Sequence, residues 1–276
     1  MSAIIPNSLT ARLRNRFGWT RHSYFLFSAL VITCGLIGII WWPLAEAELR
    51  ALDPTIPWWL QADWLLFGNF LVMSLLIMAG ADLKSDIWMV GVGLAGGLVI
   101  ESWGTQTELW FYYTNERPPL WIIPAWPVAA LSIDRLVRLL DTLIPENQQT
   151  LFKWIYWPVF IGFMALMLHF VRFTFDKSFT LVAILLCVLL IITPTNYRTT
   201  MLTFAAGAGL GYFLELWGTT RYCWIYYTYE QPPLFAVLAH GMAAVAFWRT
   251  ALYVRTFAGK LAARRNPTPQ PDPTGD

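Results

Sequence analysis

The order of apolar and polar positions divides this chain into long apolar runs separated by short polar segments. Eight runs approach the length of about 20 residues that a helix needs to cross a bilayer. Helices are expected because backbone groups in lipid must be hydrogen-bonded within the protein. The predicted spans cover residues 24–42, 62–80, 87–103, 119–139, 152–171, 179–194, 201–217 and 232–250. The predicted fold class is an all-α integral membrane protein with eight transmembrane helices.

Part of the chain occurs twice, because residues 93–135 return as residues 207–249. The two windows are identical at 18 of 43 positions, and their centres read ESWGTQTELWFYYTNERPPL and ELWGTTRYCWIYYTYEQPPL. Each repeat holds four spans, an even number, so both copies should cross the membrane in the same direction as parallel repeats. The predicted organisation is a cytoplasmic segment 1–23, four-helix repeats 24–140 and 141–250, and a cytoplasmic tail 251–276 whose proline-rich end is disordered.

Composition and charge agree with a membrane location. Apolar residues make up 57% of the chain and charged residues 13%, against about a quarter in ordinary globular proteins. Fourteen of the nineteen Lys and Arg residues fall in segments that lie on the same side of the membrane as the N-terminus. This bias predicts that both termini are cytoplasmic. The first apolar run exceeds the usual core of a signal peptide, about 7–15 residues, and is interpreted as a retained span. We therefore expect a multi-pass protein of a bacterial inner membrane, with no nucleic-acid partner.

Two acidic residues lie on glycine-lined stripes of the third and seventh spans. Gly93, Gly97 and Glu101 follow one another at intervals of four residues, so they share one helix face. The two glycines form a GxxxG pair, which allows a neighbouring helix to approach this face closely. Glu101 and its copy Glu215 should then point into protein. A carboxylate inside a span is a functional candidate, although both also lie near span ends, where water would allow a purely structural role. If they share a cavity, their mutual repulsion keeps one protonated and available as an acid.

An aromatic cluster follows each glutamate and suggests a binding wall for an apolar substrate. The alternative is an interfacial belt, where Trp and Tyr are common, whereas a π-rich pocket would stabilise positive charge. The candidate substrate-binding residues are Trp103, Trp110, Tyr112, Tyr113, Glu116, Trp217, Trp224, Tyr226, Tyr227, Glu230 and His240.

Other polar and breaker residues receive simpler interpretations. The pairs Pro118–Pro119 and Pro232–Pro233 are predicted to start the following helices. Arg135 and Arg249 are predicted to snorkel to the cytoplasmic face. The histidines show no metal-ligand spacing, so neither a metal nor another cofactor is predicted.

The order Glu-x-x-Gly, a Thr-containing turn, aromatic-x-Tyr-Tyr-Thr and a Pro-initiated helix resembles the membrane carotenoid-biosynthesis proteins of the carotenoid-hydratase type. It is carried by Glu101 to Thr114 with Pro118, Pro119 and Trp126, and less completely by Glu215 to Thr228 with Pro232 and Pro233. The resemblance implies polytopic enzymes that add water to terminal carotenoid double bonds without a cofactor. The family's Gly-Pro-Phe-Gly-like turn is replaced here by residues 106–109 and 220–223.

These observations lead to a functional hypothesis with one alternative. The chain is expected to be a membrane enzyme that acts on a long, carotenoid-like isoprenoid or another lipid by acid-catalysed hydration or cyclisation. Glu101 and Glu215 would be the catalytic proton donor and its partner. The alternative is a non-enzymatic transporter or a structural subunit of a membrane complex, and an oligomer or a membrane-protein partner stays open.

Overall fold

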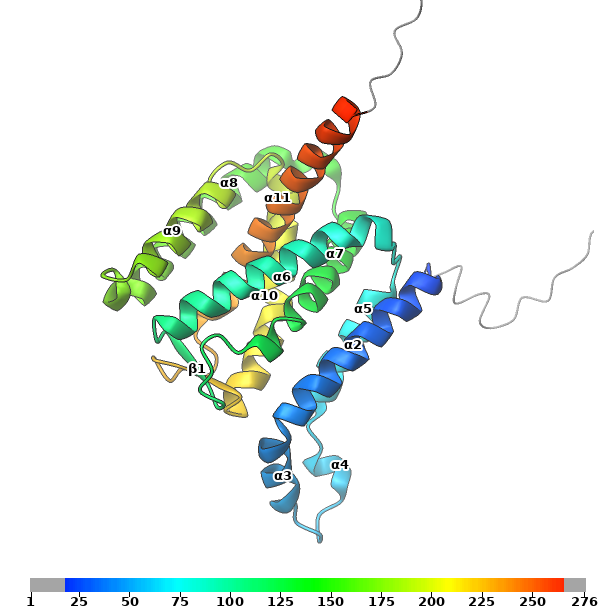
Figure 1. The fold of residues 1–276 in the computed structure, drawn as a ribbon, viewed down its shortest axis with the longest axis vertical. Helices are drawn as coiled ribbons and strands as arrows, with labels where there is room; N and C mark the ends of the chain where they lie inside the picture. The colour runs from blue at the N-terminus through cyan, green and yellow to red at the C-terminus, as the bar shows by residue number, and fades with distance from the viewer. Residues whose placement is uncertain (1–17, 266–276) are drawn as a thin grey trace, which may run out of the picture.

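The computed structural model describes residues 18–265, with side chains described as far as residue 261. The predicted disorder at the end of the tail therefore falls outside the described residues, as does most of segment 1–23. Ten α-helices and two short strands occupy the described part (Figure 1). Their bounds are α2 Arg21–Ile40, α3 Trp42–Arg50, α4 Trp58–Gln61, α5 Trp64–Met78, α6 Leu83–Gln106, β1 Trp110–Tyr112, α7 Ala125–Leu143, α8 Gln149–Val171, α9 Ser178–Ile191, α10 Tyr197–Thr220, β2 Trp224–Tyr226 and α11 Leu234–Arg265, with 3-10 turns η1 Leu120–Ile122, η2 Glu146–Gln148 and η3 Arg172–Thr174.

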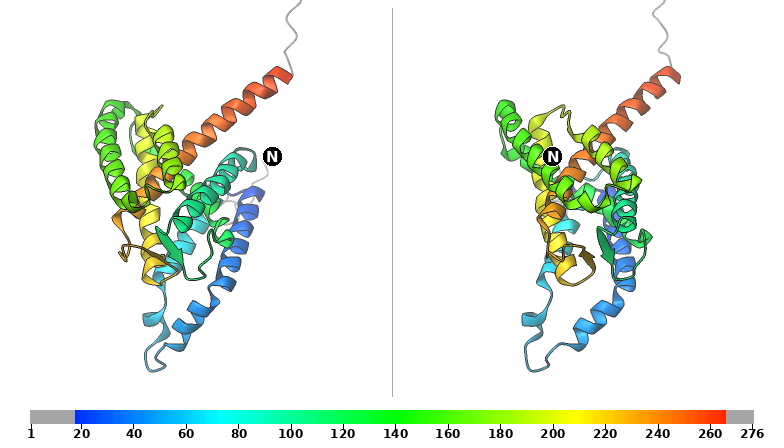
Figure 2. Two further views of the ribbon diagram at one scale, coloured as in Figure 1. Left: turned by 60° about the vertical axis from the view of Figure 1, so that its left-hand side comes forward. Right: turned by 90° about the vertical axis from the view of Figure 1, so that its left-hand side faces the viewer.

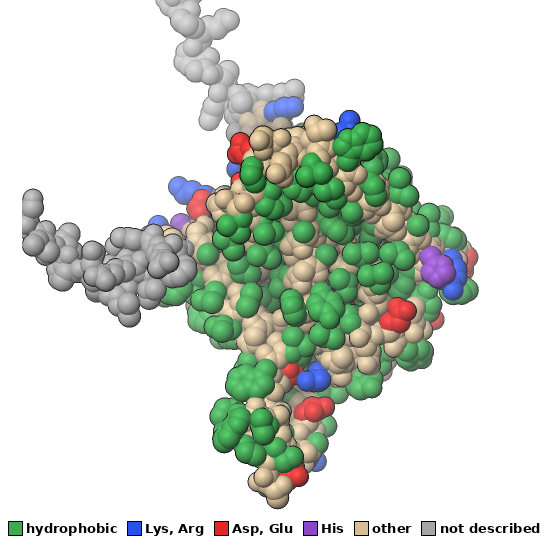
Figure 3. Space-filling model, turned by 180° about the vertical axis from the view of Figure 1, so that it is seen from behind, with side chains coloured by type: hydrophobic (Ala, Val, Ile, Leu, Met, Phe, Trp, Pro, Cys, Tyr) green, Lys and Arg blue, Asp and Glu red, His purple; other side chains and the backbone are tan. Residues whose placement is uncertain are grey.

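A helix lies at each of the eight predicted spans, which confirms the all-helical class. Within residues 18–265, five segments are long and apolar enough to cross a membrane by length and composition: α2, α6, α7 with η1, α8 with its flanking turns, and most of α11. Helices α5 and α9 are apolar but shorter, and α10 is not among the five. Hydrophobic side chains cover most of the face in Figure 3, and charged side chains lie mainly towards its edges. Apolar helices of this kind are compatible with a membrane protein.

Four helices form the centre of the molecule. Helix α7 packs against α6 and α10, and α11 packs against α10 and α6. Helix α5 lies on α7 and α10, whereas α9 lies on α11 and α6. Helix α2 runs beside α5, and α3 and α4 project from the rest of the molecule (Figures 1 and 2). The start of α2 and the end of α11 point towards the opposite end from α3 and α4.

The starts and ends of α6 and α10 explain how these helices hold the same position in the two halves. Asp82 caps α6 by accepting a hydrogen bond from the Lys84 amide, and Asn196 caps α10 by accepting from the Thr199 amide. Such side chains satisfy amide groups that a helix start leaves without partners. Both helices then run for 24 residues and end at corresponding positions, so they present their glutamates at the same distance from their ends.

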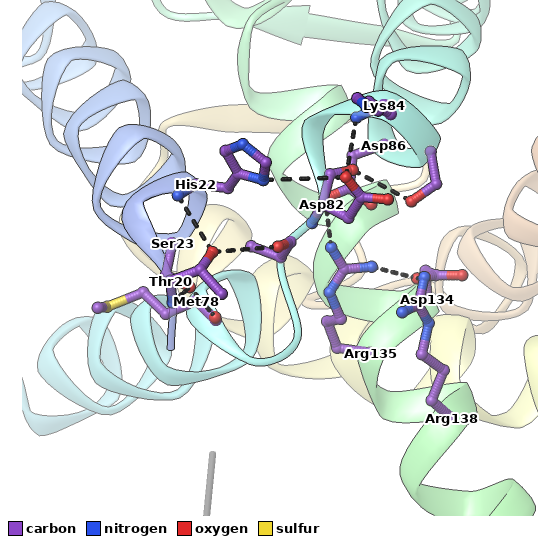
Figure 4. A network of polar contacts seen from close by, with 12 residues as sticks. Thr20, His22, Ser23, Met78, Asp82, Lys84, Asp86, Asp134, Arg135 and Arg138 are labelled. Carbon is purple, nitrogen blue, oxygen red and sulfur yellow. Dashed lines mark hydrogen bonds and ion pairs between the residues drawn. The ribbon is translucent and has the colours of Figure 1, made fainter. Parts of the chain in front are cut away.

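The prediction that Arg135 and Arg249 snorkel to a surface is wrong. Arg135 donates a 2.6 Å hydrogen bond to Asp86 Oδ2, and both side chains are 2% exposed. Figure 4 shows this ion pair within a network that joins α2, α6 and α7. Arg249 is also buried and donates to the Thr193 carbonyl and to the Tyr253 hydroxyl. Both arginines stay inside because internal acceptors bind their terminal guanidinium nitrogens, whereas the buried Nε of Arg135 has no partner among the described residues.

The proline prediction holds in one copy only. Helix α11 begins at Leu234, directly after Pro233, but α7 begins at Ala125, after the turn η1. The first copy has Pro124 where the second has Leu238. Pro124 has no backbone N–H, so it cannot donate a helical hydrogen bond to a carbonyl of the preceding turn. The helix therefore starts only after Pro124. The peptide bonds before Pro118 and Pro232 are both cis.

Candidate active site

The two repeated loops meet in a small antiparallel ladder that the sequence analysis did not predict. Strands β1 and β2 pair with Phe111 opposite Ile225 at the centre. On either side, Trp110 lies opposite Tyr226 and Tyr112 lies opposite Trp224. Each tryptophan is thus paired with the tyrosine of the other copy. This register places the indoles and phenols of both loops beside the ends of α6 and α10.

The carboxylate of Glu101 is buried and accepts three hydrogen bonds. Trp110 Nε1 donates to Oε2 at 3.1 Å, while Tyr112 Oη and Trp126 Nε1 donate to Oε1 at 2.9 and 3.1 Å. Glu101 is only 3% exposed, as the glycine-stripe argument predicts. Donors arranged around a buried carboxylate replace the hydrogen bonds to water that it has lost.

The carboxylate of Glu215 has an equivalent set of partners with one chemical change. Trp224 Nε1 donates to Oε2 at 2.9 Å and Tyr226 Oη to Oε1 at 2.8 Å. The third partner is His240 Nε2, 2.9 Å from Oε1, at the position that corresponds to Trp126. Glu215 is also 3% exposed. Among the described side chains, no Lys or Arg forms an ion pair with either glutamate.

Glycines make room for these donors, which gives them a more specific role than helix packing. A Cβ on Gly104 would lie 1.8 Å from the Trp110 ring, and one on Gly218 would lie 2.0 Å from the Trp224 ring. A Cβ on Gly97 would lie 2.4 Å from the Trp126 ring. The indoles therefore cross the helix surface at glycine positions on their way to the carboxylates. Gly93 has the predicted packing role, because its Cβ would lie 2.8 Å from the Pro127 backbone.

The two phenols are held in their protonated, donating form. Burial raises the pKa of Tyr112 and of Tyr226 well above the ordinary tyrosine value. The charges of Glu101 and Glu215 both act on each phenol and raise its pKa further. Both carboxylates therefore lie close enough to influence both phenols. At physiological pH each phenol remains a hydrogen-bond donor.

A large apolar cavity lies beside both glutamates. Its volume is about 1680 Å³, compared with about 300–1000 Å³ for sites of drug-sized ligands. Side chains from each of the helices α2 to α11 and from both strands line it, most of them aliphatic or aromatic. Glu101, Glu215 and His240 are among the few polar groups on its wall. The cavity is large enough for a long hydrocarbon ligand.

The structure separates the predicted substrate-binding residues into two groups. Those that line the cavity are Trp103, Trp110, Tyr112, Trp217, Trp224, Tyr226 and His240. Those that do not line it are Tyr113, Glu116, Tyr227 and Glu230.

The residues outside the cavity have structural contacts or lie at the surface. Tyr113 donates to the Ile40 carbonyl and Tyr227 to the Phe170 carbonyl, so these phenols fasten the two loops to α2 and α8. Glu116 and Glu230 are exposed, and Glu116 accepts a hydrogen bond from the Trp121 indole.

Three further residues at the cavity were missed as site candidates. Trp126 supplies the third donor to Glu101. It could have been selected from the sequence, because it occupies the position that corresponds to the candidate His240. Trp41 packs its ring 5.0 Å from that of Trp217 and lines the cavity. Asp63 accepts hydrogen bonds from Trp217 Nε1 at 2.8 Å and from Arg221 Nε at 3.1 Å. Both Trp41 and Asp63 lie outside the similar windows 93–135 and 207–249, so the sequence repeat gave no reason to select them.

Comparison of this chain with known protein families, with curated proteins and with solved structures gave no match.

Proposed function

We propose that the chain crosses the membrane eight times as two parallel four-helix repeats, with both termini in the cytoplasm of a bacterium. Corresponding contacts support this arrangement, since α7 packs on α10 as α11 packs on α6. The β1–β2 register supports it as well. Phe111 pairs with Ile225, its own counterpart in the other copy, and the flanking pairs Trp110–Tyr226 and Tyr112–Trp224 are equivalent to each other. A twofold relation along the membrane normal would produce both features.

Within that frame, the proposed activity is acid-catalysed hydration or cyclisation of a long isoprenoid or similar lipid. The observation that carries the proposal is the position of two buried carboxylates, each with three partners, on the wall of an apolar cavity of about 1680 Å³. An apolar lining favours a hydrocarbon over the hydrated ions of the alternative transporter function. The resemblance to carotenoid-hydratase-type proteins supplies the substrate class.

The partners of the carboxylates suit acid catalysis because they stabilise the conjugate base. When a glutamic acid gives its proton to an alkene, the carboxylate that forms accepts the surrounding N–H and O–H groups. These hydrogen bonds are stronger to the charged product than to the neutral acid, so they lower the barrier for proton transfer.

The reaction balances without a cofactor. The π electrons of a terminal double bond form a C–H bond with the glutamic acid proton, which leaves a carbocation beside aromatic rings that stabilise it. In hydration, water adds to the carbocation and its proton returns to the carboxylate. In cyclisation, a second double bond of the same chain adds instead, and a proton is then lost from carbon to the carboxylate.

The proposal is tested by incubating the full-length protein in nanodiscs with a linear C40 polyene in deuterated water. Both reactions place deuterium on carbon, and hydration also adds one water to the polyene mass, as measured by mass spectrometry. Glu101→Gln and Glu215→Gln should each abolish most of this incorporation, because Gln keeps the shape but can neither donate a carboxylic-acid proton nor carry the negative charge of a carboxylate. Glu46→Gln, on exposed α3, is the matched control and should remain active. Equal incorporation by all variants would refute the proposal.

A further inference from the structure

The two glutamates differ in one partner, and that partner decides which of them can exchange a proton. Trp126 Nε1 lies 3.1 Å from Glu101 Oε1, and His240 Nε2 lies 2.9 Å from Glu215 Oε1. The two rings also stack, with centroids 5.9 Å apart and planes 16° apart. The Trp126 and His240 rings therefore lie face to face where the two halves of the site meet.

Counting donors and acceptors shows the consequence for Glu101. An indole N–H can only donate, so Trp110 and Trp126 require an acceptor on both oxygens of the carboxylate. Protonation of Glu101 would turn one oxygen into a donor, with only the Tyr112 oxygen able to accept from it. The geometry around Glu101 therefore favours a carboxylate that remains ionised.

The same count for Glu215 gives a different result. Only Trp224 is an obligatory donor there, and it bonds to Oε2. Both partners of Oε1, Tyr226 Oη and His240 Nε2, can either donate or accept. A proton on Glu215 Oε1 can be donated to His240 Nε2 with every hydrogen bond retained.

We propose that Glu215 and His240 form the proton-exchanging half of the site, whereas Glu101 remains an ionised carboxylate that stabilises positive charge on the substrate. This assignment rests on the proposed function and specifies it, because Glu215 becomes the acid and His240 the group that recharges it.

The route of the proton follows from the ring of His240. Its Nδ1 has no hydrogen-bond partner among the described residues, and its side chain is 21% exposed and lines the cavity. A proton that arrives at Nδ1 allows the Nε2 proton to move to Glu215 Oε1. The imidazole is then neutral with its proton on Nδ1, and Glu215 is a neutral acid. After proton transfer to the substrate, the returning proton reverses these steps.

The other ionisable groups around this pair do not compete for the proton. Tyr226 and Tyr112 are buried phenols that stay protonated, and Glu101 is held by its three donors. Cys223 is a buried thiol whose pKa is raised to about 12, mainly by burial. Among the described residues of the site, His240 is therefore the group with a ring nitrogen left open to accept a proton from the cavity.

The test is spectroscopic and needs no substrate. Infrared spectra of the full-length protein in nanodiscs are recorded between about pH 5 and pH 8, the range in which histidine changes its charge. A protonated-carboxyl band that shifts in deuterated water should be present in the wild type, lost in Glu215→Gln and retained in Glu101→Gln. Loss of the band in Glu101→Gln alone, or absence of any such band across this range, would overturn the assignment.

Variants at the third partner give a second, independent check. His240→Trp makes the second half like the first and should remove the band, because an indole cannot accept from Glu215. Trp126→His makes the first half like the second and should add a band that disappears in Trp126→His/Glu101→Gln. No change in either variant would refute the role of the third partner. If the bands follow this pattern while polyene deuteration fails, only the proposed reaction falls.

Discussion

The glycines at the ends of α6 and α10 provide the sharpest structural prediction. Gly218→Ala would place a Cβ 2.0 Å from the Trp224 ring, a distance that forces the indole to move. The movement breaks the 2.9 Å hydrogen bond from Trp224 Nε1 to Glu215. Gly209, on the same helix, has open space around the position of a Cβ, so Gly209→Ala is the matched control.

The two substitutions should have opposite effects on stability. Loss of a hydrogen bond to a charged group costs about 1.5–3 kcal/mol, and overpacking adds about 1–3 kcal/mol. Replacing Gly by Ala inside a helix returns about 1 kcal/mol. Gly218→Ala should therefore lose about 1.5–5 kcal/mol, whereas Gly209→Ala should gain up to about 1 kcal/mol.

The assay is thermal unfolding in detergent, followed by tryptophan fluorescence. One kcal/mol corresponds to about 2–4 °C for a protein of this size, so a loss of about 3 kcal/mol lowers Tm by about 6–12 °C. Gly104→Ala should behave in the same way because its Cβ would meet the Trp110 ring at 1.8 Å. If Gly218→Ala and Gly209→Ala melt together, the indole does not cross the helix at this glycine, and the argument for the site geometry fails.

Three other predictions follow from the structure. Arg135→Ala should destabilise the protein by about 3–5 kcal/mol in detergent melts, because it leaves Asp86 buried without its ion-pair partner; an Arg135→Ala/Asp86→Ala double variant that is no more stable would contradict this. Burial raises the pKa of Cys223 to about 12, so its thiol is protonated at pH 8 and should react with iodoacetamide only after unfolding; labelling of the folded protein would show that the thiol is accessible. Single cysteines at Gln106 and Thr220, in a cysteine-free background, should both react with an impermeant thiol reagent applied from outside; reaction of only one would refute the parallel repeats.

The features that the sequence predicted are those with a local or repeated signal. The helices follow from long apolar runs, and the burial of Glu101 and Glu215 follows from glycines at a spacing of four. The aromatic partners Trp110 and Tyr112 were found because they recur 114 positions later. Each of these inferences needs only residues within one helix and its following loop.

The features that it did not predict depend on contacts between distant segments. The β1–β2 ladder joins residues from the two halves of the chain, and its three-residue strands are too short to give a pattern. The third partner of each glutamate comes from the next helix, so its identity depends on how that helix packs. The burial of Arg135 depends on Asp86, a partner 49 positions away. Only folding brings these groups together.

A buried negative charge at Glu101 is unfavourable in the resting protein, but it favours the positively charged transition state of the proposed reaction. In the proposed mechanism an ionised Glu101 is surrounded by neutral donors, and no Lys or Arg among the described side chains pairs with it. A neutral hydrocarbon in the cavity would not relieve that buried charge, whereas a carbocation would. The interaction is therefore stronger in the transition state than with the bound substrate, which is the condition for an interaction to accelerate a reaction. An arginine next to Glu101 would stabilise the resting protein, but it would cancel the field that favours positive charge on the substrate.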